Sequence, residues 1–213
     1  IRDRYCGIQA AVLDITRGRE RVQDLASAIA QKLVVTLGEE LASNIRLAPT
    51  WFVDIRHVLV SCSWYVRTCW LKAIIGGWCT TIGMHNEVIW PCIFGCTDAR
   101  DELNHYLRCP ILWCIARDSL GVREDSIQVG HRLGLSEPSA VKFNLLAFCH
   151  SLYHSIKNDC ACIDTQGMIR DGMIVQRRAG EIARHVRHDF ADALVMWADD
   201  RLSLYTSPSP RDA

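Results

Sequence analysis

The sequence has no excess of charge of either sign. Lysine plus arginine and aspartate plus glutamate number 24 each among 213 residues, so the formal net charge is zero. A neutral chain has no overall attraction to nucleic acid or to an anionic membrane, and any such binding must come from a local patch. The apolar content of 49% is high enough for a packed core.

No apolar run is long enough to predict a membrane span. The longest apolar region extends from about Val58 to Cys79, and two cationic residues and a Gly-Gly pair interrupt it. Because a spanning helix needs about 20 consecutive apolar residues, we interpret this region as protein core. The N-terminal residues also lack the pattern of a secretory signal peptide. The sequence therefore predicts no membrane partner.

Several short catalytic motifs are missing as well. The sequence contains no glycine-rich phosphate-binding motif, no Walker motif and no H-E-x-x-H run. Nothing around the cysteines matches a local signature of a cysteine hydrolase. We therefore predict that the chain has no catalytic activity of its own and no small-molecule substrate.

Cysteine, in contrast, is abundant. The 11 cysteines are scattered along the chain, and their number is odd. A disulfide framework is typical of short secreted chains with an even number of cysteines. We therefore expect reduced thiols, some buried and some bound to metal, in an intracellular protein of the nucleus or cytoplasm.

Four residues in the run PCIFGCTDARDELNHYLRCP have the chemistry and spacing of a zinc site. Cys92 and Cys96 form a C-x3-C pair, and Gly95 suits the tight turn between them. His105 and Cys109 form an H-x3-C pair, which on one helix would place both side chains on the same face. Three thiolates and one imidazole leave no open position for a catalytic water, so we predict one structural Zn2+. The alternative is a cysteine-rich core segment that contains a histidine.

A second group of possible ligands lies further along the chain. It consists of Cys149, His150, His154, Cys160 and Cys162. The C-x-C spacing is tight for zinc, and Cys149 falls on the apolar face of a predicted helix. We interpret the group as core thiols and surface histidines, and a second zinc site is the alternative.

Apolar periodicity predicts a mainly α-helical fold, a helical domain built around a small Cys3His zinc-binding module. Helices are expected over residues 21–46, 58–75, 98–108, 112–121, 139–158 and 173–199, with Asp98 as a cap and a loop over 122–137. The expected regions are an N-terminal helical region (1–69), the zinc-binding module (70–121), a C-terminal helical region (122–203) and a tail (204–213).

The tail is unlike the rest of the chain. Residues 204–213 closely resemble a translated sequencing-library adapter, so we expect them to be artefactual or disordered and exclude them from the fold prediction. The chain also begins with Ile1 rather than Met. Both features favour a fragment of a longer protein.

The segment from about Trp70 to Leu120 resembles the zinc-binding region that follows the polymerase domain in non-LTR (LINE-type) retrotransposon reverse transcriptases. The matching residues are Cys92, Cys96, Asp101-Glu102, His105-Tyr106-Leu107, Cys109-Pro110 and Trp113, preceded by Trp78-Cys79-Thr80-Thr81 and His85. One departure is the gap of three residues between His105 and Cys109, where four is commoner in the family. The resemblance covers about a quarter of the chain.

This resemblance implies a nucleic-acid-binding accessory module with RNA or DNA as its partner. Arginines near the module and in the last predicted helix are the candidate phosphate contacts. They are Arg100, Arg108, Arg117, Arg177, Arg178, Arg184 and Arg187.

The polymerase that the resemblance would place in the parent polyprotein is not found in this chain. Two-metal catalysis needs carboxylates from separate strands, and the candidates are Asp54 and the pair Asp199-Asp200. We interpret both as decoys, because the pair follows the zinc module instead of preceding it. The alternatives to a nucleic-acid-binding module are a helical protein–protein interaction domain with buried structural cysteines, and a non-functional degenerate retroelement copy.

Overall fold

The computed structural model describes residues 29–35, 51–123, 126–161, 180–181 and 183–184. Their regular secondary structure is helical, and the only extended pairing among them is a single antiparallel bridge between Pro91 and Arg100. The predicted mainly α-helical fold is confirmed for the described part of the chain. None of the helices in this part is long and apolar enough to cross a membrane.

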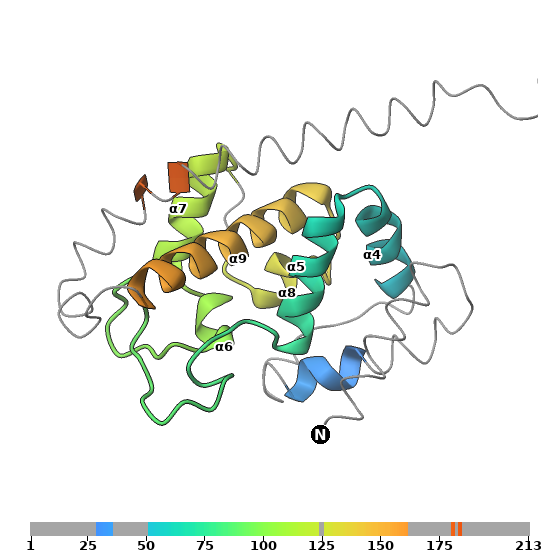
Figure 1. The fold of residues 1–213 in the computed structure, drawn as a ribbon. Helices are drawn as coiled ribbons and strands as arrows, with labels where there is room; N and C mark the ends of the chain where they lie inside the picture. The colour runs from blue at the N-terminus through green and yellow to red at the C-terminus, as the bar shows by residue number, and fades with distance from the viewer. Residues whose placement is uncertain (1–28, 36–50, 124–125, 162–179, 182, 185–213) are drawn as a thin grey trace, which may run out of the picture.

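The long helix α9 (Ala140–Ala161) lies at the centre of the fold. Figure 1 shows it crossing the middle of the molecule, and α4, α5, α7 and α8 all pack against it. The predicted helix over 139–158 is therefore confirmed. Its large side chains form much of the core, and the fully buried ones include Phe143, Leu146, Phe148, Leu152 and Tyr153.

The apolar region before the zinc motif forms two helices, α4 (Trp51–Val60) and α5 (Trp64–Ile75). The prediction of one helix over 58–75 was wrong, because a short turn separates the two. Ser63 caps α5 by accepting a hydrogen bond from the N–H of Val66. Arg67 then closes the turn by donating to the carbonyl oxygens of Cys62 and Val60. Serine is a favoured N-cap residue, so the break has a local cause.

The segment between the cysteine pair and His105 is mostly not helical. Asp98 has a φ of 56°, so it lies in the left-handed region and does not cap a helix. Cys92 donates its N–H to the carbonyl of Ala99, and Asp101 donates to that of Trp90. The short helix α6 (Leu103–Tyr106) begins only after this pairing. The helix predicted over 98–108 is therefore confirmed only over residues 103–106, and its first residues are wrong because the N–H of Asp101 pairs across the loop.

Helix α7 (Pro110–Leu120) confirms the helix predicted over 112–121 and ends at Gly121. The predicted loop over 122–137 contains the short helix α8 (Val129–Arg132). The guanidinium of Arg132 lies 4.4 Å from the ring of Trp113 and donates to the carbonyl of Leu107. These contacts connect α8 to the segment between His105 and Cys109 and to α7.

The remaining predicted elements fall largely outside the described residues. Residues 29–35 are helical, which agrees with part of the first predicted helix, and so are 180–181 and 183–184 in the last. The four-region division stays a prediction. Its first boundary, after residue 69, lies inside α5.

Candidate metal centre

The predicted ligands come together in one place. The ligand atoms of Cys92, Cys96, His105 and Cys109 all lie within 4.8 Å of one another. The Cys109 sulfur is 4.0 Å from that of Cys92 and 3.5 Å from that of Cys96. With Zn–S bonds of about 2.3 Å, a tetrahedral site separates its sulfurs by about 3.8 Å. The donor set and its spacing therefore fit a zinc ion.

Local backbone structure explains how the three cysteines converge. Gly95 has a φ of 82° and donates its N–H to the carbonyl of Cys92, which folds the chain back between the first two ligands. A side chain at that φ would be strained, so glycine suits the position. Cys109 is the N-cap of α7, and its sulfur accepts a hydrogen bond from the N–H of Leu112. A helix N-terminus favours the thiolate that metal binding requires.

His105 reaches the cluster from a different helix than expected. It lies on α6, which ends at Tyr106, whereas Cys109 precedes α7. The expectation that both share one helix face was wrong, because Pro110 starts a new helix. The Nε2 atom of His105 is buried and has no hydrogen-bond partner within the described part of the chain. One ring nitrogen of His105 lies within 4.8 Å of the three cysteine sulfurs, and imidazole is a ligand that zinc commonly takes beside thiolates.

The three thiols differ in the direction in which their pKa values are shifted. The hydrogen bond from Cys109 holds the pKa of Cys92 below its ordinary value. Donating that bond raises the pKa of Cys109, and burial raises the pKa of Cys96. Three thiolates in so small a space repel one another, and a bound cation would supply the charge that lets all of them ionise.

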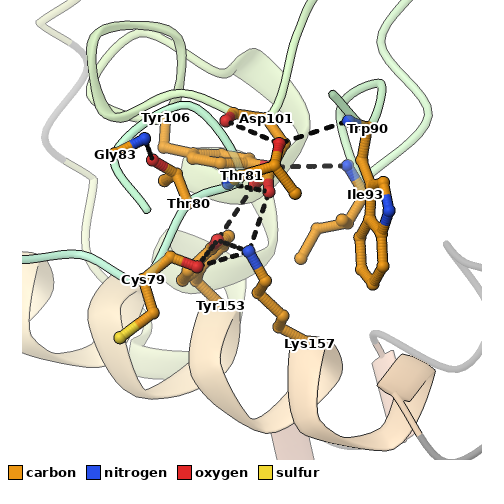
Figure 2. A network of polar contacts seen from close by, with 10 residues as sticks. All are labelled: Cys79, Thr80, Thr81, Gly83, Trp90, Ile93, Asp101, Tyr106, Tyr153 and Lys157. Atoms are coloured by element: carbon orange, nitrogen blue, oxygen red, sulfur yellow. Dashed lines mark hydrogen bonds and ion pairs between the residues drawn. The ribbon is translucent and has the colours of Figure 1, made fainter. Parts of the chain in front are cut away.

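A buried carboxylate beside the metal centre was missed by the sequence reasoning. The sequence pattern marks Asp101 only as one member of the acidic pair Asp101-Glu102, but its side chain is fully buried. Figure 2 shows its carboxylate surrounded by donors. Thr81 donates a backbone N–H over 2.7 Å, and Tyr106 donates its hydroxyl over 2.8 Å.

Two further donors to Asp101 come from α9. The hydroxyl of Tyr153 lies 2.9 Å from one carboxylate oxygen, and the ammonium of Lys157 lies 2.8 Å from the other. Lys157 also donates to the hydroxyl of Tyr153 and to the carbonyl of Cys79. Burial is the main cause that raises the pKa of both Tyr106 and Tyr153, so both hydroxyls stay protonated and donate. No sequence motif connects Tyr153 and Lys157 to Asp101.

The second predicted group is only partly described. Cys149 is fully buried, as expected for a core thiol. His150 is also buried, with 5% of its surface exposed, so its prediction as a surface histidine was wrong. The side chains of Cys160 and Cys162 lie outside the described residues. Among those described, Cys92, Cys96, His105 and Cys109 form the only group of three or more possible ligands.

Burial keeps His150 neutral. Desolvation is the main cause that lowers its pKa to about 3, with His154 and Lys72 adding to the effect. Its Nδ1 lies 3.5 Å from the sulfur of Cys69, whose pKa burial raises to about 11. Neither shift favours a thiolate–imidazolium pair, so this contact does not have the charge state of an activated nucleophile.

We expect acidification to destabilise the protein through His150. Its folded-state pKa lies below its ordinary value, so its contribution to stability is complete above about pH 6.5 and is lost as the pH falls toward 3. Urea unfolding at about pH 7 and about pH 5 measures the free energy of unfolding. This free energy should fall more between the two pH values for the wild type than for His150→Gln. The predicted zinc ligands are the same in both proteins, so equal losses would contradict the prediction.

The candidate nucleic-acid contacts that the structure describes differ in their surroundings. Arg100 and Arg108 are exposed and next to the metal centre in the chain, whereas Arg117 lines a small pocket with Arg132 and Lys142. Arg184 is exposed; Arg177, Arg178 and Arg187 lie outside the described residues.

Of the two carboxylate positions that resemble a polymerase site, the structure describes one. Asp54 is exposed on α4 and belongs to no group of three or more possible metal ligands in the described part of the chain. The pair Asp199-Asp200 lies outside it.

Comparisons with protein-family models, with curated proteins and with solved structures found no match.

Proposed function

We propose that this chain contains a structural zinc module that binds RNA or DNA, as part of a LINE-type retrotransposon reverse transcriptase, and that it has no catalysis of its own. The observation that carries the proposal is the convergence of Cys92, Cys96, His105 and Cys109 within 4.8 Å. Their order and the Cys-Pro and Trp that follow also resemble the family's pattern. Four protein ligands would leave zinc no open position for a substrate.

Metal content tests the first half of this proposal. The full chain, purified under reducing conditions without added zinc, should contain about one zinc per molecule by elemental analysis. The double variant Cys92→Ser/Cys109→Ser should contain none. Well-folded wild-type protein without zinc would overturn the proposal.

Nucleic-acid binding tests the second half. Fluorescence anisotropy with single-stranded RNA and DNA should show weaker binding for Arg100→Glu/Arg108→Glu, by roughly tenfold or more at low salt, because phosphate contacts dominate such affinities. Arg56→Glu is the control, since α4 lies far from α6 in the fold (Figure 1). Equal binding by all three proteins would exclude these arginines as contacts.

A helical protein–protein interaction domain is the second candidate. It is favoured by apolar side chains left exposed around the turn between α4 and α5. Trp64 is 62% exposed, Val60 54% and Tyr65 41%. Exposed aromatic residues are enriched at protein interfaces. This candidate requires no metal, so the zinc measurement separates it from the first.

A further inference from the structure

We propose that α9 positions the metal ligands through the carboxylate of Asp101, so that Tyr106, Tyr153 and Lys157 are positioning residues that raise the metal affinity of the Cys3His site. The inference depends on the metal centre proposed above and adds a long-range determinant to it. It also means that the zinc module does not hold its geometry alone.

The first step is the hydroxyl of Tyr106, which connects the two ligand-bearing segments. It accepts a hydrogen bond from the N–H of Ile93 over 3.3 Å and donates to Asp101 over 2.8 Å. Ile93 follows the ligand Cys92, and Tyr106 follows the ligand His105. One buried hydroxyl therefore fixes the cysteine loop relative to α6, in the way that outer hydrogen bonds orient metal ligands.

The second step is the anchoring of Asp101 itself. Its side chain is fully buried, so water cannot replace a lost donor. Thr81 supplies one donor, and Tyr153 and Lys157 supply two from α9, with Tyr153 52 residues away in sequence. Figure 2 shows these donors reaching the carboxylate from the loop and from the helix. Removing the α9 donors would loosen the carboxylate of Asp101. The hydrogen bond from Tyr106 to that carboxylate would then be weakened.

The third step is the charge balance. Lys157 neutralises Asp101, and its ammonium also contacts the carbonyl of Cys79 and the hydroxyl of Tyr153. All three ammonium protons therefore have acceptors. Since neither member of the ion pair is a metal ligand, the network can orient the ligands in the folded site without competing for the ion.

Zinc affinity of the full chain tests the inference, measured by competition with a chromogenic chelator. Tyr106→Phe and Lys157→Met should each bind zinc about ten- to a hundredfold more weakly, the usual range for losing an outer-sphere partner. Tyr153→Phe is a milder variant that keeps the test informative if Lys157→Met fails to fold. The Co2+ spectrum of each variant should keep the bands of a tetrahedral thiolate site, because the four ligands are unchanged.

Two matched substitutions serve as controls. Tyr65→Phe removes a hydroxyl that bonds Ser151. Lys142→Met, on α9 like Lys157, removes an ammonium that bonds Glu137. Both should bind zinc as the wild type does. Wild-type affinity in Tyr106→Phe and Tyr153→Phe would overturn this inference and leave the metal centre intact, whereas a wild-type chain that binds no zinc would overturn both.

Discussion

Cys96→Ser is expected to abolish tight zinc binding and to unfold the segment 92–113. Structural zinc contributes about 10–16 kcal/mol to the folding of small zinc modules, and three ligands hold the ion far less tightly than four. Cys96 is only half-buried, so the substitution itself leaves little cavity. Amide hydrogen exchange should lose protection across 92–113, and elemental analysis should show the loss of zinc.

Cys114→Ser is the matched control for this substitution. Cys114 lies on α7 a few residues beyond the last ligand, is exposed and contacts Asp118. The Cys114→Ser variant should keep its bound zinc and its protection from amide exchange across 92–113. Protection across 92–113 that survives in Cys96→Ser would show that the fold there does not depend on metal.

Asp101→Ala is expected to destabilise the zinc-loaded protein by about 3 kcal/mol, because removing one partner of a buried ion pair leaves the other without compensation. The N–H of Thr81 and the hydroxyl of Tyr106 lose their acceptor at the same time. The value is at the low end of the usual range, since Lys157 is 16% exposed and can partly reach water. Urea unfolding with saturating zinc measures the change.

Glu137→Gln is the appropriate comparison for Asp101→Ala. Glu137 also pairs with a lysine of α9, Lys142, but it is 76% exposed. The ammonium of Lys142 is buried, but it keeps the backbone carbonyl of Glu137 as an acceptor. The exposed carboxylate itself contributes little, so the unfolding midpoint should move little. A similarly small effect of Asp101→Ala would show that the buried network is not a major source of stability.

The metal ligands could be predicted from the sequence because their signal is local. Four ligands lie within 18 positions, from Cys92 to Cys109, and their residue types suit only a few ions. The helical periodicity that predicted α9 is equally local. Where local signals competed, the prediction failed: the cap at Ser63 divided the helix expected over 58–75, and Pro110 begins a helix that leaves His105 on a separate one.

The network around Asp101 could not be predicted, because its members are far apart in the chain. In the sequence, Asp101 follows Asp98, the expected cap, and so has the pattern of an acid near the start of a helix. Its burial depends on Lys157 and Tyr153, which approach only after α9 packs against the rest of the fold. His150 was wrongly predicted to lie on the surface for a similar reason. A histidine in a helix has no local mark that separates a core position from a surface one.

The position of Lys157 also bears on where this protein can be divided. A fragment that ends at Gly121, after the last residue with family resemblance, contains all four ligands but leaves Asp101 as an unpaired carboxylate. It would also expose the surfaces of α5 and α7 that α9 covers. The shortest piece suited to recombinant expression therefore extends through α9, and a minimal peptide would be a poor substitute for it.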